Sequence, residues 1–201
     1  MTVSQRDLVR LKVTLDHVKP KVERWLVVPL KIRLDRLHQT LQAAMPWTDS
    51  HLWEFSAGDM EWSIPDPEGD MYGGFAPLDA RKTTLLQLLN ETGVKKLTYV
   101  YDFGDGWRHT IKLDRFHSMP VEFNAPFLVE AWGLCPPEDC GGPYGYADLL
   151  AALADASHED HEHALEELGE DYDPSVVPTG RLKELVDELA EQWRPKPRKP
   201  R

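Results

Sequence analysis

Alternating apolar and polar residues open the chain. The alternation runs over residues 8–18, is interrupted by Pro20 and Lys21, and resumes over residues 22–28 before Pro29. A period of two is typical of strands with one buried face. The pattern therefore predicts a hairpin of two half-buried strands.

A helical spacing replaces the alternation from residue 34 onward. Apolar residues then recur every three or four positions, at Leu34, Leu37, Leu41 and Ala44. We therefore predict an amphipathic helix over residues 34–45, ended by Pro46. Two short strands over residues 51–55 and 60–64 are predicted to follow, and then a loop rich in Pro, Gly and Asp over residues 65–77.

Further helices are predicted from caps and spacing. Thr84 is placed to cap a short helix that runs through Leu89, and Gly93 lies just beyond the end of that helix. Residues 117–145 are expected to be irregular, with one strand over residues 127–132. The remaining helices are predicted over residues 146–154, 159–168 and 179–193.

Strands first and helices later are typical of an α+β fold. We expect an antiparallel sheet of about five to six strands, packed with a helix from the N-terminal half and a C-terminal group of helices. Residues 1–193 would form a single domain, helical from about residue 146. The tail, residues 194–201, is basic and rich in proline, so we expect it to be disordered.

Charge is unevenly distributed over the chain, whose net charge is −11. Residues 1–36 hold nine basic and four acidic residues, residues 135–193 hold sixteen acidic and two basic ones, and the last eight residues hold five basic ones. The negative total argues against general nucleic-acid binding, although the basic ends allow local contacts. A solvated acidic helical face and a solubilising tail account for the same pattern.

Several classes of protein are excluded or made poor hypotheses by what the sequence lacks. There is no apolar run of eighteen residues and no apolar stretch typical of a signal peptide, so we expect a cytoplasmic protein without a membrane partner. Two cysteines are too few for a disulfide framework. The phosphate-loop, GxGxxG and GxSxG motifs are also missing.

The clearest candidate chemistry lies in a predicted hairpin. The runs 96–103 and 107–116 flank Asp105-Gly106, a strong signal for a two-residue turn. This turn would place Asp102 opposite His109 at the end of an apolar face, whereas a three-residue loop would separate them. Such a pair suits acid–base chemistry or a divalent metal, or it forms a structural hydrogen bond that closes the sheet.

The loop CPPEDCGGPYGY, residues 135–146, is the second candidate. Cys135 and Cys140 form at most half of a zinc site, to be completed by His109 or His117, with Glu138 or Asp139. A reversible disulfide is a further hypothesis. The structural alternative is a rigid loop with small buried thiols.

Histidine and aromatic residues form two weaker candidates. A stacking pocket for a base or an amide could be formed by His38, His51 and Trp53 together with the other tryptophans. The alternative is that most of these rings pack in the core. His158 and His161 in the segment SHEDHEH could share a helix face, but Glu162 stands where a His-Glu-x-x-His zinc helix needs histidine.

These motifs, in their order, resemble the plasmid pRiA4b ORF-3-like family. The segments LHQTLQAAMPWTDSHLWEF, YDFGDGWRHTIKL, CPPEDCGGPYGY and LEELGEDYDP carry the resemblance, which covers about residues 6–176. It implies a compact α+β domain and a bacterial protein associated with plasmids or mobile elements, some members being labelled TnpR-like. No catalytic role transfers with it.

Two functions are weighed on this basis. The first is a binding module for nucleic acid, a nucleotide or a protein partner, with Tyr101, Asp105, Trp107, His38, His51 and Trp53 as binding candidates. The second is a metal-assisted hydrolase that uses Asp102 and His109 with Glu138 and Asp139. The second requires the loop over residues 135–142 to approach the end of the 96–116 hairpin.

Overall fold

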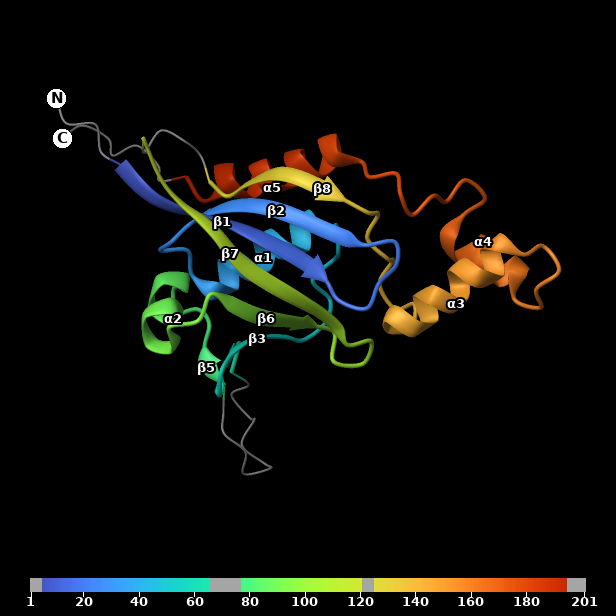
Figure 1. The fold of residues 1–201 in the computed structure, drawn as a ribbon, viewed down its shortest axis with the longest axis horizontal. Helices are drawn as coiled ribbons and strands as arrows, with labels where there is room; N and C mark the ends of the chain where they lie inside the picture. Colours follow the sequence, from blue (N-terminus) through green and yellow to red (C-terminus); the bar gives the residue numbers. More distant parts are fainter. Residues whose placement is uncertain (1–4, 66–76, 121–124, 195–201) are drawn as a thin grey trace.

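The computed structural model describes residues 5–65, 77–120 and 125–194, which build one twisted sheet with helices packed on it and beyond its end (Figure 1). The strands are β1 (Gln5–Leu15), β2 (Val22–Pro29), β3 (Trp53–Ala57), β4 (Met60–Ser63), β5 (Leu78–Asp79), β6 (Lys96–Tyr101), β7 (Trp107–Pro120) and β8 (Phe127–Trp132). The helices are α1 (Leu34–Ala44), α2 (Leu85–Thr92), α3 (Gly142–Ala154), α4 (His161–Leu168) and α5 (Thr179–Gln192).

The sheet confirms the α+β class but is larger and less uniform than predicted. In the described residues it has eight strands in the order β5-β4-β3-β6-β7-β1-β2-β8, rather than five to six. All neighbours are antiparallel except β4 and β5, which are parallel. Strand β5 has only two residues, too few to show a period, so hydrophobic spacing could not reveal it.

The strand β7 is longer than its own alternation suggests. It pairs with β1 from Leu15 opposite His109 to Gln5 opposite Pro120, with an irregularity between Arg10 and Leu11. Residues 117–120, which were expected to be irregular, therefore belong to this strand. Backbone pairing with β1, rather than local side-chain pattern, sets where β7 ends.

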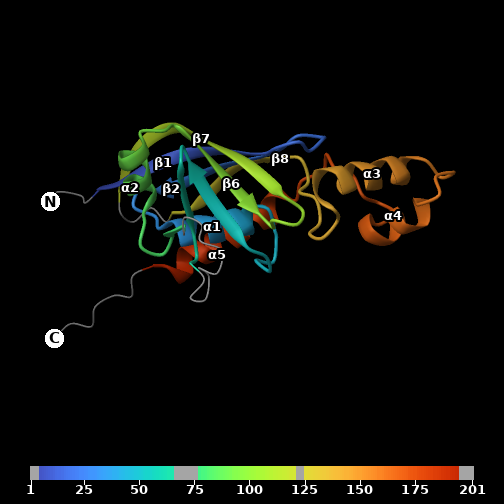
Figure 2. The ribbon, with the colours of Figure 1, turned by 90° about the horizontal axis from the view of Figure 1, so that it is seen from below.

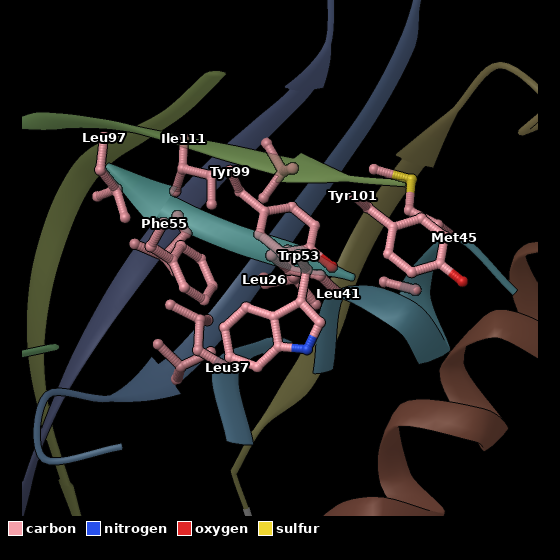
Figure 3. Close-up of a cluster of buried hydrophobic side chains, with 14 of the residues drawn as sticks. Leu26, Leu37, Leu41, Met45, Trp53, Phe55, Leu97, Tyr99, Tyr101 and Ile111 are labelled. Atoms are coloured by element: carbon pink, nitrogen blue, oxygen red, sulfur yellow. The ribbon is translucent and has the colours of Figure 1, made fainter. Parts of the chain in front are cut away.

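Helices α1 and α5 lie on the same face of the sheet (Figure 2). The core lies between them and the sheet, where Leu41 of α1 packs near Phe55 and Tyr99 (Figure 3). Alternate residues of β6 and β7 point into this core, including Tyr101 and Ile111. Burial of these apolar side chains supplies the main driving force for the fold.

The opposite face of the sheet carries Arg10 and Lys12 of the basic N-terminal segment, and both are in ion pairs. Arg10 pairs with Asp114, and the Nζ atom of Lys12 lies 2.7 Å from Oε1 of Glu23. The Arg10 guanidinium also stacks 4.8 Å from the centroid of the Trp25 ring. The basic surplus at the start of the chain is therefore partly neutralised within the sheet.

Local signals predicted the helix ends well where caps are present. The Thr84 hydroxyl accepts a hydrogen bond from the Gln87 backbone N–H in a capping box, and Gly93 ends α2 at φ 67°. Helix α3 begins at Gly142 instead of the predicted residue 146, because Pro143 fits the first helical turn.

Helices α3 and α4 lie side by side beyond one end of the sheet (Figures 1 and 2). The backbone N–H of Leu134 donates to the Pro174 carbonyl, and the Tyr146 and Tyr172 hydroxyls lie 2.9 Å apart, which ties these helices to the flanking segments. No described helix is long and apolar enough to cross a membrane. Most of the predicted 65–77 loop and all but Arg194 of the predicted tail fall outside the described residues.

Candidate functional site

The hairpin between β6 and β7 has a longer turn than predicted. Its last pair is Tyr101 with Trp107, so residues 102–106 form a five-residue loop. The Gly106 N–H closes this loop by donating to the Asp102 carbonyl at 2.7 Å. As a result His109 pairs with Tyr99, three positions away from the predicted partner Asp102. The predicted Asp102–His109 pair is wrong.

His109 lies in the core instead of at the mouth of the sheet. It is fully buried, with Nδ1 3.3 Å from the Tyr99 carbonyl oxygen and no hydrogen-bond partner for Nε2. Burial lowers the pKa of His109 to about 4, because the charged imidazolium loses its hydration there. Trp107, another candidate, is likewise a fully buried core residue.

Asp102 faces a different histidine. The Nε2 atom of His51 lies 3.7 Å from Oδ2 of Asp102 and 3.0 Å from Oδ1 of Asp139. One donor atom from each of these three residues lies within 4.8 Å of the other two. We call His51, Asp102 and Asp139 the donor trio. They come from three separate segments: the connection before β3, the hairpin loop, and the loop over residues 135–142.

The two oxygens of Asp102 have different surroundings. Oδ1 accepts hydrogen bonds from the backbone N–H groups of Gly104, at 2.9 Å, and Asp105, at 3.3 Å. Oδ2 is the oxygen closer to His51. The backbone of Asp102 is held at φ 55°, and its N–H donates to the Leu52 carbonyl at 2.8 Å. The side chain is thus oriented before any ligand arrives.

Glu138 fixes the third segment rather than joining the donor trio. Its Oε1 accepts the Tyr101 hydroxyl hydrogen bond at 2.5 Å, and its Oε2 accepts from the Thr48 N–H at 2.8 Å. Burial and this carboxylate raise the pKa of Tyr101. The indole N–H of Trp47 donates to the Pro136 carbonyl at 3.0 Å. Glu138 therefore holds the segment next to Asp139, and among the described residues it is not one of the three grouped donors.

The loop over residues 135–142 does reach the hairpin, as the hydrolase hypothesis required. A Cβ atom added to Gly142 would lie 2.2 Å from the carbonyl oxygen of Asp105, so only glycine permits this approach. The side chain of Asp105 has a buried Oδ2 without a hydrogen-bond partner. Two segments far apart in sequence thereby meet at the donor trio.

The Gly142→Ala substitution is expected to lower the free energy of unfolding by about 2 kcal/mol, because it adds a steric clash to the cost of positive φ. Gly58→Ala is the matched control: Gly58 also has positive φ, 62°, but no atom lies within 4 Å of its added Cβ. Urea denaturation of both variants checks this. Equal losses of stability would show that the contact with Asp105 is unimportant.

The two cysteines are placed as buried packing groups. Cys135 is buried and Cys140 is half-buried, and both are free thiols. Burial raises the pKa of Cys135 to about 12 and that of Cys140 to about 11, which leaves the reactive thiolate scarce at neutral pH. Neither belongs to the donor trio among the described residues. The half-site for zinc finds no support in this geometry.

His38 belongs to a closed ring of hydrogen bonds. Gln42 donates to the Tyr99 hydroxyl at 3.0 Å, and this hydroxyl lies 2.7 Å from Nδ1 of His38. His38 Nε2 lies 2.6 Å from Oδ1 of Asp49, whose backbone N–H donates back to Gln42 at 3.2 Å. The neutral tautomer of His38 that is protonated at Nε2 satisfies every hydrogen bond in this closed set.

This closed set of hydrogen bonds holds the segment between α1 and β3, which contains His51. Asp49 stands two residues before His51, and the Ser50 N–H donates to the Tyr101 hydroxyl at 3.0 Å. Trp53 stacks on His38 with ring centroids 4.1 Å apart, and both are buried. At His38 and Trp53, the ring faces predicted to stack on a ligand therefore stack on each other. His51 itself precedes β3, whose first residue is Trp53, instead of lying in the strand as predicted.

Two of the predicted histidines stand apart from the donor trio. His158 is exposed, with Nδ1 accepting from the Asp160 N–H, and His161 Nδ1 lies 2.8 Å from the Ala152 carbonyl. Sequence reasoning singled out every member of the donor trio but missed their grouping. Asp49 was missed altogether, and the loop sequence offered no signal for its contact with His38.

Comparisons with known proteins agree with this architecture. The family model described as plasmid pRiA4b ORF-3-like protein matches residues 7–180. The chain belongs to this family. This pRiA4b ORF-3-like chain is 50% identical over 194 residues to the uncharacterized protein y4hQ of Sinorhizobium fredii (strain NBRC 101917 / NGR234), a match that spans 96% of this chain and 97% of that protein.

A solved structure resembles this pRiA4b ORF-3-like protein closely. It is the crystal structure of the protein of unknown function MM3350 from Methanosarcina mazei Go1, with a TM-score of 0.76 and 26% sequence identity. The similarity covers 87% of this chain and 97% of that one. The family predicted from the motifs is thereby confirmed, and the comparisons assign no reaction or ligand to it.

Proposed function

We propose that this protein binds a divalent cation through the donor trio, and that the bound ion is the centre of its activity. The observation that carries this proposal is the convergence of one imidazole and two carboxylates within 4.8 Å from three separate segments. The Nε2 atom of His51 is buried without a hydrogen-bond partner, although Asp139 lies close to it. A metal ion would satisfy both groups at once.

The donor set favours a particular kind of metal. One imidazole nitrogen with two carboxylates suits zinc or manganese better than calcium, which prefers oxygen ligands alone. Three protein ligands leave at least one coordination position for water or substrate, as in catalytic rather than structural sites. When bound, the ion would supply Lewis-acid chemistry at that position.

Metal-assisted hydrolysis is the reaction class that we propose for this centre. Asp102, held by two backbone N–H groups, and His51, two residues after the hydrogen-bonded Asp49, would hold the ion. Asp139 is 71% exposed at its side chain, so it faces incoming substrate as well as His51. With Oδ1 of Asp139 facing His51, its other carboxylate oxygen would be left to accept a proton from an attacking water.

A nucleic-acid or nucleotide partner has weaker support. The basic side chains Arg10 and Lys12 of the sheet face are already paired with carboxylates, and the donor trio is acidic. Phosphate groups would therefore meet few unpaired cations in the described part of the chain near this centre. A protein partner remains a proposal without a specific surface.

Calorimetric titration of chelator-treated protein with Mn²⁺ and Zn²⁺ tests the metal centre. We expect one ion per chain, and an affinity that falls by about 100-fold or more in Asp102→Asn and His51→Ala, because each removes a ligand atom. His158→Ala, which removes an exposed histidine outside the donor trio, is the control. Unchanged affinity in both donor variants, or no binding to the wild-type protein, would refute the proposal.

A further inference from the structure

A cavity of about 300 Å³ lies between α3, α4 and the loop over residues 135–142. Its size is at the lower end of pockets that take small organic ligands. Helices α3 and α4, which form its sides, lie next to each other beyond the end of the sheet (Figure 2). Its lining comprises Asp139, Cys140, Gly145, Asp148, Leu149, Ala152, Asp160, His163 and Glu167.

The cavity adjoins the donor trio through one shared residue. Asp139 lines the cavity and also lies 3.0 Å from His51 at the candidate metal centre. The close approach of Gly145 to the Cys140 carbonyl, where an added Cβ would lie 2.1 Å from the oxygen, holds this wall against α3. A ligand in the cavity would therefore share Asp139 with the candidate metal centre.

The walls of the cavity combine apolar and acidic surfaces. Leu149 and Ala152 are buried and form its apolar part. Asp148 and Glu167 are exposed carboxylates, and within the described residues no lysine or arginine lines the cavity or pairs with either of them. A concave surface lined by one sign of charge concentrates ligands of the opposite sign.

We propose that this cavity binds a small organic cation, a primary amine or guanidinium compound, and presents its far end to the metal centre. The apolar wall would pack against the methylene chain of such a ligand, while the carboxylates accept hydrogen bonds from its charged head. A phosphorylated ligand is disfavoured there by charge. The part of this inference that concerns a reaction rests on the proposed metal-assisted hydrolysis. Binding of the organic cation to the cavity does not require the metal.

Calorimetric titration with agmatine, a guanidinium ligand with an amine at its other end, tests the proposal. We expect saturable binding to metal-free protein, weakened at least about tenfold in the double variant Asp148→Asn/Glu167→Gln, which removes two charge-assisted hydrogen bonds. The matched control is Glu184→Gln/Asp187→Asn, which removes the same charge from the exposed face of α5. Adenosine monophosphate serves as the anionic probe.

The outcomes separate this inference from the metal proposal. Equal weakening of agmatine binding in both double variants would show general counterion attraction and overturn the cavity assignment, as would tighter binding of the nucleotide. If Asp102→Asn abolishes Mn²⁺ binding while agmatine still binds, both proposals stand. If Mn²⁺ never binds but agmatine binding depends on Asp148 and Glu167, only the metal proposal fails.

Discussion

Replacing Arg24 by alanine is expected to lower the free energy of unfolding by about 4 kcal/mol. Arg24 is completely buried, and its guanidinium donates to the carbonyl oxygens of Ala44 at 2.7 Å, Trp132 at 2.9 Å and Gly133 at 3.0 Å. It therefore connects β2 to the end of α1 and to the segment that leads into the loop over residues 135–142. Alanine would leave these carbonyls without partners and open a cavity.

Urea denaturation of Arg24→Ala against wild type measures this effect. Arg24→Lys is expected to recover only part of the stability, because an ammonium cannot span the same carbonyl oxygens as the planar guanidinium. Arg108→Ala is the control on the exposed face of the sheet, where a change within about 0.5 kcal/mol is expected. A loss below about 1 kcal/mol in Arg24→Ala would show that these hydrogen bonds do not hold the fold together.

The pH dependence of stability is expected to reveal the buried His109. Its folded pKa is about 4, against 6.5 for the free side chain. As pH falls below 6.5, the unfolded chain takes up a proton that folded His109 does not accept, so acid favours unfolding. Between pH 7 and pH 4 this difference removes up to about 3 kcal/mol of stability.

Denaturation curves at pH 7 and pH 4 for wild type and His109→Leu isolate this contribution. The wild type should lose about 3 kcal/mol more than the variant over this interval. His38, whose pKa burial also lowers, is present in both proteins and cancels in the comparison. The control His158→Leu removes an exposed histidine and should follow the wild type. Parallel losses in wild type and His109→Leu would mean that His109 becomes protonated within the fold.

The strands and helices followed from local patterns wherever spacing and caps agreed. Alternation predicted the β1–β2 hairpin, and the apolar spacing of Leu34, Leu37 and Leu41 predicted α1. Thr84 and Gly93 located the ends of α2. These elements depend on residues close in sequence, so their signals are present in any short window. The family was evident from the motifs for the same reason.

The pairing register of the hairpin between β6 and β7 could not be predicted from local patterns. Asp105-Gly106 favours a two-residue turn, yet Asp102 closes a five-residue loop through its own carbonyl and carboxylate. Contacts from outside the hairpin support that loop: Leu52 accepts from the Asp102 N–H, and Gly142 packs against Asp105. A register shift of an odd number of residues changes the face on which each side chain lies, which is why one wrong turn misplaced the whole Asp102–His109 hypothesis.

The sequence by itself determined the fold class, the family, most elements and the residues capable of chemistry. Only the tertiary structure decided which of them meet. His51 approaches Asp102 and Asp139 because β3 pairs with β6, and because Glu138 and Gly142 hold the loop over residues 135–142 against the hairpin. His109, equally suited by residue type, is instead buried in the core. Residue identity sets what a side chain can do, whereas its partners depend on chain segments far apart in sequence, which local patterns do not encode.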